Sequence, residues 1–185
     1  MVPHSPFKHD HLIDLPEGLS HFEVLSLSPH WRIDPDTLKK KFLELSALVH
    51  PDRYDALGPP ESLYALRWST AVNRAYQTLR DPEECTRYFL KVNGVDTDKI
   101  QGGTPTDLAE EYFEAQDGPQ PQLISFRNRL EDQLKTCEAT SQSLAKQWPS
   151  PNDRRILSEL KDNFVRSRYI RSMLTDLNKH LEVTP

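Results

Sequence analysis

Apolar residues recur along most of the chain at intervals of three and four, the spacing that places side chains on one face of an α-helix. No stretch alternates convincingly between apolar and polar residues, as a half-buried strand does. Prolines and glycines lie mostly between the helical stretches, where they end one element and begin the next. This pattern predicts an all-α protein.

The first half of the chain contains four predicted helices. They cover about residues 19–27, 35–49, 61–79 and 82–93. Asp34-Pro35 marks the start of the second helix, because aspartate accepts hydrogen bonds at an N-cap and proline suits the first helical position. Pro51 ends it near His50, since the residue before a proline disfavours the α conformation. We expect the second and third helices to pack antiparallel through two apolar stripes. The stripes are Leu38, Phe42, Leu45 and Val49 in one helix and Ala65, Trp68, Val72, Tyr76 and Leu79 in the other.

The second half contains three predicted helices, at about residues 106–117, 121–147 and 151–181. A connector rich in turn-forming residues, between Val95 and Thr106, separates them from the first half. Their apolar residues form continuous stripes, which predicts a three-helix bundle with Cys137 in its core rather than in a reactive site. We therefore expect a flexible N-terminal segment and two helical domains, at residues 1–18, 19–97 and 98–185.

Composition and charge narrow the possible functions. The net charge of −5 and the pI near 5.8 argue against a surface built for nucleic acid, which needs a dominant basic footprint. Cys85 and Cys137 lie far apart and in no CxxC spacing, so the sequence indicates neither a disulfide framework nor a zinc or iron–sulfur site. No apolar run reaches the length of a membrane span, and the first residues have no signal or transit pattern. We expect a soluble, unprocessed cytoplasmic protein without a cofactor.

Three histidines near the start, His4, His9 and His11, are the one grouping with the residue type of a metal site. No cysteine or well-spaced carboxylate completes a ligand set around them. We interpret them as flexible surface histidines and predict no metal site.

The tripeptide His50-Pro51-Asp52 falls in the loop between the two paired helices. The sequence places no nucleophile, paired base or metal partner around it, so the tripeptide does not resemble a catalytic site. Proline fixes the backbone at this exposed position and holds the neighbouring imidazole and carboxylate in a defined relation. A carboxylate presented in this way can accept charge-assisted hydrogen bonds from an arginine. The tripeptide is therefore predicted to contact another protein.

Around this tripeptide the sequence resembles the J-domain family. The matching segments are Phe22-Glu-Val-Leu25, Leu45-Ser-Ala-Leu-Val-His-Pro-Asp-Arg53 and Val72-Asn-Arg-Ala-Tyr-Gln-Thr-Leu-Arg-Asp-Pro82. More narrowly, the chain is similar over nearly everything after residue 19 to HscB, the J-proteins of iron–sulfur cluster assembly, in which a three-helix bundle follows the J domain. The Tyr88-Phe-Leu90 segment ending at Asn93-Gly94, and the lack of a Gly/Phe-rich linker or zinc module, agree with that branch.

The resemblance implies that residues 19–97 form a J domain that docks on an ATPase chaperone of the HscA/DnaK type, in the seventy-kilodalton heat-shock class. The implied docking residues are His50, Pro51, Asp52 and Arg53 in the loop and Lys39, Lys40 and Lys41 in the preceding helix. An ordinary solvated helix face is the alternative reading of the three lysines. ATP hydrolysis would be accelerated in the partner, so this chain is predicted not to be an enzyme.

The resemblance further implies that residues 98–185 bind an IscU-type iron–sulfur scaffold through the first helix of the bundle. The residues assigned to that contact are Leu108, Glu111, Tyr112, Phe113 and Glu114. The family's motif can be laid on Phe113-Glu114 only after a shift of one residue, and the acidic residues of this helix also suit its dipole. A specialised J-domain co-chaperone with a different client is therefore the alternative.

Two further groups of residues suggest other contacts. Arg166, Arg168 and Arg171 of the last helix are the basis of a third hypothesis, a helical nucleic-acid-binding protein. Acidic residues nearby favour solvated arginines or contacts with a family-specific partner instead. Trp31 and Trp148 are expected to pack at helix ends rather than to anchor an interface.

Overall fold

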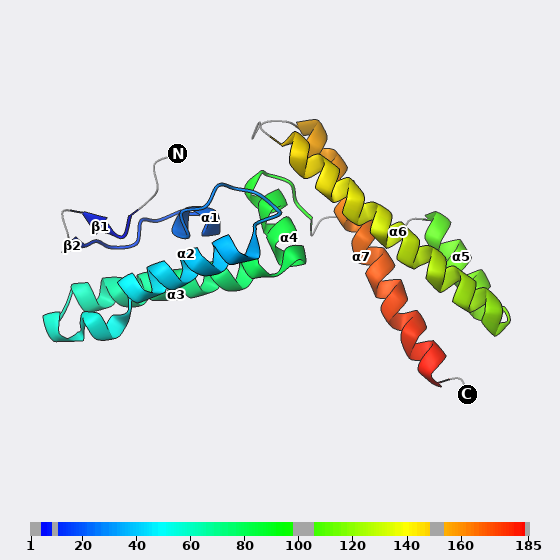
Figure 1. Cartoon of the computed structure of the whole chain (residues 1–185), viewed down its shortest axis with the longest axis horizontal. Coiled ribbons are helices and arrows are strands. Elements are labelled where there is room, and N and C mark those ends of the chain that lie inside the picture. The colour runs from blue at the N-terminus through cyan, green and yellow to red at the C-terminus, as the bar shows by residue number, and fades with distance from the viewer. Residues whose placement is uncertain (1–4, 9–10, 98–105, 149–153, 184–185) are drawn as a thin grey trace. The chain divides into compact units, whose positions relative to one another are not determined.

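The computed structural model describes residues 5–8, 11–97, 106–148 and 154–183 of the 185-residue chain (Figure 1). The strands and α-helices are, in order, β1 (Phe7–Lys8), β2 (His11–Leu12), α1 (His21–Val24), α2 (Pro35–Leu48), α3 (Glu61–Arg80), α4 (Pro82–Val92), α5 (Thr106–Asp117), α6 (Gln120–Gln147) and α7 (Arg154–Val183). Two 3-10 turns, η1 (Pro51–Arg53) and η2 (Asp55–Leu57), lie between α2 and α3. The predicted all-α class is confirmed, with one small hairpin in addition.

The chain divides into two compact units, Met1–Val92 and Asn93–Pro185. This division precedes the predicted domain boundary after residue 97. Helix α4 ends at this division, and Gly94, with a φ of 77°, follows its last turn. A residue in this left-handed conformation is a frequent helix end.

The hairpin of α2 and α3 forms the framework of the first unit. Asp34 caps α2 by accepting a hydrogen bond from the Thr37 N–H at 2.8 Å, as the sequence predicts. The predicted stripes face each other, although Phe42 and Tyr76 are half-buried and stack at the edge, with 4.1 Å between ring centroids. The buried members of the hairpin are Leu38, Leu45, Val49, Ala65, Trp68, Val72, Ala75 and Leu79.

Helix α1 is much shorter than the predicted segment of residues 19–27. Its start is a capping box, in which the Glu23 N–H donates to Ser20 Oγ at 3.3 Å and the Ser20 N–H donates to Glu23 Oε2 at 2.8 Å. Its end comes at Val24, and Ser26 then takes a φ of 53°. Because such a positive φ is incompatible with a helix, the apolar residues after Val24 continue in an irregular segment.

The described part of residues 1–18, predicted as a flexible segment, contains a short hairpin. Strands β1 and β2 pair antiparallel, and Leu12 is buried. The following residues lie along α3, where the Trp68 indole N–H donates to Ile13 O at 2.9 Å and Arg67 pairs with Asp14 at 2.6 Å. A buried tryptophan needs an acceptor for its N–H, and this segment supplies it.

Aromatic side chains pack between α4 and the rest of the first unit. Asp81 caps that helix by accepting from the N–H groups of Glu83 and Glu84, both at 2.9 Å. Phe89 of α4 packs on Trp31, with 5.0 Å between ring centroids, and both side chains are buried. The prediction that Trp31 is a packed residue is confirmed.

Helices α6 and α7 form a long pair in the second unit, and α5 packs on α6 (Figure 1). The core contains the buried residues Leu108, Ala115, Leu123, Phe126, Leu130, Cys137, Ile170, Met173 and Leu177. All three helices contribute to it, and Cys137 lies in it as predicted. The predicted start of the last helix at residue 151 lies outside the described residues, and the described helix begins at Arg154.

Candidate functional site

The tripeptide His50-Pro51-Asp52 lies at the end of the α2–α3 hairpin. Helix α2 ends at Leu48, and His50 is extended, with φ −63° and ψ 127°, so the backbone leaves the helix one residue before the proline. Pro51 then opens the 3-10 turn η1. The turn is held by hydrogen bonds from Arg53 N–H to His50 O at 3.1 Å and from Tyr54 N–H to Pro51 O at 2.8 Å.

The two ionisable side chains of the tripeptide face solvent close together. His50 Nδ1 lies 3.6 Å from Asp52 Oδ2, and the two side chains are 56% and 82% exposed. At this exposure the attraction between them is weak, because water screens it. Both groups are therefore free to form stronger bonds with a partner that displaces the water.

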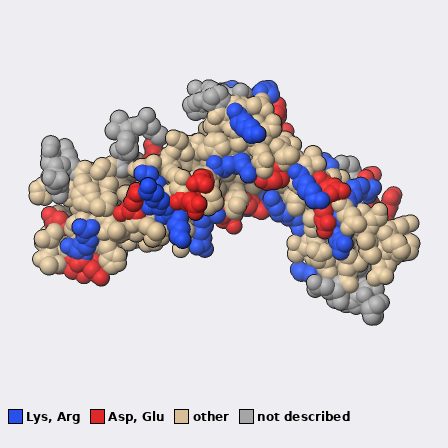
Figure 2. All heavy atoms as spheres, in the orientation of Figure 1, with Lys and Arg blue, Asp and Glu red and all other residues tan. Residues whose placement is uncertain are grey.

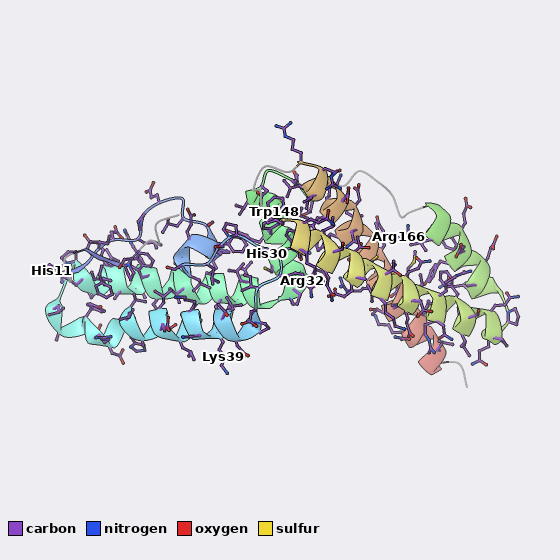
Figure 3. All side chains as sticks on the ribbon, turned by 45° about the horizontal axis from the view of Figure 1, so that its top comes forward. His11, His30, Arg32, Lys39, Trp148 and Arg166 are labelled. Carbon is purple, nitrogen blue, oxygen red and sulfur yellow. The ribbon has the colours of Figure 1, made fainter. Side chains whose placement is uncertain are left out.

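The predicted basic residues of α2 do not form one cluster with the loop. Lys39 lies about eleven residues before His50, which is roughly 16 Å along the helix at 1.5 Å per residue. Its side chain points away from the hairpin (Figure 3), and Lys40 is exposed as well. Lys41 is different, because its Nζ lies 3.7 Å from Glu44 Oε2. The charge available to a partner thus comes chiefly from Lys39 and Lys40.

Two residues of the loop also contact the end of α2. Arg53 Nη1 donates to Ala47 O at 2.8 Å, and the Tyr54 hydroxyl donates to Leu48 O at 2.9 Å. Sequence reasoning assigned Arg53 only to a partner and passed over Tyr54. Pro51 was the feature of the sequence that indicated such contacts, because a proline that ends a helix leaves backbone carbonyls without their helical donors.

The residues predicted on α5 divide into two sets. Leu108 is 1% exposed and Tyr112 packs against the core, with its ring 6.3 Å from that of Phe126. On the outside, Phe113 is 64% exposed and Glu114 is exposed too. A contact with a partner could therefore use Phe113 and Glu114, whereas Leu108 has almost no surface to offer.

Glu111 of α5 is engaged within the same unit. Its Oε2 lies 2.7 Å from Arg129 Nη2 of α6. The pair is partly exposed, so a partner can still reach the carboxylate, but only in competition with this arginine. Glu111 thus ties α5 to α6 and is a weaker candidate for a contact than Glu114.

The arginines of α7 contact neighbouring side chains of the bundle. Arg166 donates to Gln133 at 3.1 Å, Arg171 to Ser167 at 3.5 Å, and Arg168 lies over the Phe164 ring. Basic and acidic side chains are interspersed over the face shown in Figure 2. This distribution offers little support for a nucleic-acid surface.

Cysteine and histidine chemistry adds no second site within the described residues. Cys85 and Cys137 are both buried and free. Burial, and to a smaller extent the charge of Asp81, raises the pKa of the Cys85 thiol to about 12, which leaves it protonated and unreactive. His11 is exposed, while His4 and His9 lie outside the described residues. No group of three potential metal ligands occurs in the part that the structure describes.

Trp148 follows α6 and is half-buried, consistent with the expected packing at a helix end. Among the described helices, none has the length and apolar character needed to span a membrane.

No protein-family model matches the chain. The "Co-chaperone protein HscB homolog" of Burkholderia thailandensis is 35% identical over 113 residues, which are 61% of this chain and 59% of that protein. The protein of the same name from Paraburkholderia phymatum is 39% identical over 77 residues, 42% of this chain and 44% of that one. These alignments thus span about three-fifths or less of the relatives.

Two solved structures have a similar fold. The human co-chaperone protein HscB matches with a TM-score of 0.65 and 18% identity, over 99% of this chain and 96% of that one. Chaperone HscB from Vibrio cholerae matches with a TM-score of 0.57 and 20% identity, over 89% and 98%. At these identities the likeness concerns the arrangement of helices.

Proposed function

We propose, from the premise that this chain is a homologue of the HscB co-chaperones, that it joins an ATPase chaperone to an iron–sulfur scaffold protein. One observation carries the proposal: His50-Pro51-Asp52 stands exposed on a fixed turn between two paired helices, in a chain that has a separate helical unit after it. The first unit is the J domain, and the second holds the client.

The loop acts in this proposal by presenting a carboxylate. Asp52 is 82% exposed and pairs with an arginine of an HscA/DnaK-type chaperone through charge-assisted hydrogen bonds. His50 and Pro51 give the turn its shape, and Lys39 and Lys40 attract an acidic part of the same partner. Hydrolysis of ATP takes place in the chaperone, and this chain itself catalyses no reaction.

The outer face of α5 binds the scaffold. Phe113 supplies an exposed aromatic side chain, a residue type enriched where binding energy is concentrated, and Glu114 adds negative charge beside it. The partner is an IscU-type scaffold with an apolar contact and basic residues next to it. Binding both proteins raises the local concentration of scaffold at the chaperone, which promotes maturation and transfer of the cluster.

The cytoplasm is the compartment that suits this function. Cys85 and Cys137 are free thiols, as expected in a reducing environment.

Single-turnover ATP hydrolysis by an HscA-type chaperone tests the docking. We expect the wild-type chain to accelerate hydrolysis and His50→Gln to abolish most of the acceleration, because the side chain beside Asp52 has changed. His11→Gln is the matched control, since it alters an exposed histidine of the same unit and should behave as wild type. Equal stimulation by wild type and His50→Gln would refute the docking proposal.

Titration calorimetry with an IscU-type scaffold tests the client separately. We expect binding at micromolar concentrations. If no heat of binding appears at tens of micromolar while the chaperone is still stimulated, the chain is a J-domain co-chaperone with a different client.

A further inference from the structure

Pro51 leaves two carbonyl groups at the end of α2 without their usual partners. In a continuing α-helix, the N–H of residue 51 would bond to the carbonyl of residue 47, and that of residue 52 to the carbonyl of residue 48. Proline has no N–H, and the backbone of Asp52 has already entered η1. Ala47 O and Leu48 O are therefore open to other donors, either side chains or water.

The two residues after the tripeptide supply these donors. Arg53 Nη1 donates to Ala47 O at 2.8 Å, and the Tyr54 hydroxyl donates to Leu48 O at 2.9 Å. A guanidinium at this position also suits the negative end of the helix dipole. The Tyr54 ring is only 9% exposed, so its hydroxyl is directed at the helix by packing. The chain thus leaves α2 at the tripeptide, and the next two residues hydrogen-bond to the end of the same helix.

The backbones of the same two residues close the turn. Arg53 N–H donates to His50 O and Tyr54 N–H donates to Pro51 O, at 3.1 and 2.8 Å. Each residue therefore contacts the tripeptide through its main chain and α2 through its side chain. Asp52 remains 82% exposed in this arrangement. A contact that is both exposed and fixed loses less conformational entropy when a partner binds.

We propose that Arg53 and Tyr54 are positioning residues, which hold His50-Pro51-Asp52 in the geometry for docking by binding the last carbonyls of α2. The inference rests on the proposed function, because it assumes that the tripeptide docks on a chaperone. Tyr54 is the better residue to test, since it carries no charge that a partner could attract.

Tyr54→Phe removes the hydroxyl and keeps the buried ring. In the single-turnover assay with full-length chain and HscA-type chaperone, we expect the concentration for half-maximal stimulation to rise, on the order of five-fold for one lost hydrogen bond. The maximal rate should stay unchanged, because at a saturating concentration of the chain, binding to the chaperone selects the docking geometry. Tyr64→Phe is the matched control, since the Tyr64 hydroxyl makes no hydrogen bond within the described residues.

Amide hydrogen exchange on the free chain gives a readout without the chaperone. The N–H groups of residues 53 and 54 should exchange faster in Tyr54→Phe than in wild type or Tyr64→Phe. Unchanged exchange, or faster exchange with an unchanged half-maximal concentration, would overturn the assignment. If the wild-type chain does not stimulate the chaperone, the proposed function is wrong. The hydrogen bond from Tyr54 to α2 is tested independently, because exchange in Tyr54→Phe that is no faster than in wild type would show that it does not hold the turn.

Discussion

Protonation of His21 is coupled to folding. Its ring stacks on Tyr88, with 4.3 Å between centroids, and its backbone N–H donates to the Tyr88 hydroxyl at 2.8 Å. Burial, and to a smaller extent the charge of Arg74, lowers the pKa of the imidazole below its ordinary value of 6.5. The unfolded chain therefore takes up this proton at a higher pH than the folded chain.

The stability that depends on His21 should fall as the pH is lowered. It is fully present above pH 6.5 and is lost as the pH falls from 6.5 towards the folded-state pKa. Urea unfolding between pH 7.5 and 5 measures this effect, and His21→Gln should flatten the slope whereas His11→Gln should not. Equal slopes for wild type and His21→Gln would contradict the assignment.

Single residues at the two ends of α2 were predictable where the backbone alone decides the outcome. Asp34 and Pro51 act through their own N-cap and ring geometry, so their roles follow from the sequence. The ties made by Arg53 and Tyr54 depend on how side chains are directed in the folded hairpin. Periodicity and spacing carry no such information, and these ties became visible only in the structure.

The N-terminal segment contributes to the core of the first unit. Leu12 is 5% exposed, and the residues after it lie against α3. We expect Leu12→Ala to lower the free energy of unfolding by about 2 kcal/mol, the lower end of the range for a buried leucine. Denaturant unfolding measures the change. Leu66→Ala, at a leucine that is 55% exposed in the same unit, should cost less than about 0.5 kcal/mol. Equal effects of the two substitutions would show that the segment is not packed in solution.

The proposed scaffold contact uses one face of helix α5. Phe113→Ala removes its most exposed large apolar side chain and should weaken scaffold binding about thirty-fold or more, the effect expected of an aromatic hot spot. The thermal unfolding temperature should stay near that of wild type, because the side chain is not in the core. Calorimetry measures the binding, with Leu66→Ala in the other unit as the control. Unchanged affinity in Phe113→Ala would place the scaffold elsewhere.

The long helices were predictable and the short elements were not. The predicted bounds of α2, α3 and α6 agree with the structure to within one or two residues, because a long apolar stripe fixes an element. The strands β1 and β2 are two residues each, too short to show alternation. Helix α1 was predicted too long because its apolar residues stay buried after the helix has ended, as Leu25 does.

At the scale of the whole molecule, the proposed docking combines a fixed loop with charge at some distance from it. Lys39 lies roughly 16 Å from His50 along α2, so the two residues face different parts of a bound partner. The lysines should therefore steer association without forming part of the loop contact. Salt between 0.05 and 0.3 M should raise the half-maximal concentration for stimulation.

Replacing the lysines tests their share of this salt dependence. Lys39→Gln/Lys40→Gln should raise the half-maximal concentration at low salt and reduce its slope with salt, while the maximal rate stays unchanged. Lys146→Gln, at an exposed lysine of the second unit, is the control. If the slope of the double variant matches that of wild type, the lysines belong to an ordinary solvated face.

The central claim is that one chain couples two partners through two units. Its most direct test is the single-turnover rate of ATP hydrolysis by an HscA-type chaperone, measured with the chain, with the scaffold and with both. The account predicts a rate with both that exceeds the sum of the separate effects. This excess should be mostly lost in His50→Gln, and in Phe113→Ala the rate should fall towards that of the chain alone. A rate equal to that sum, in wild type as in both variants, would contradict it.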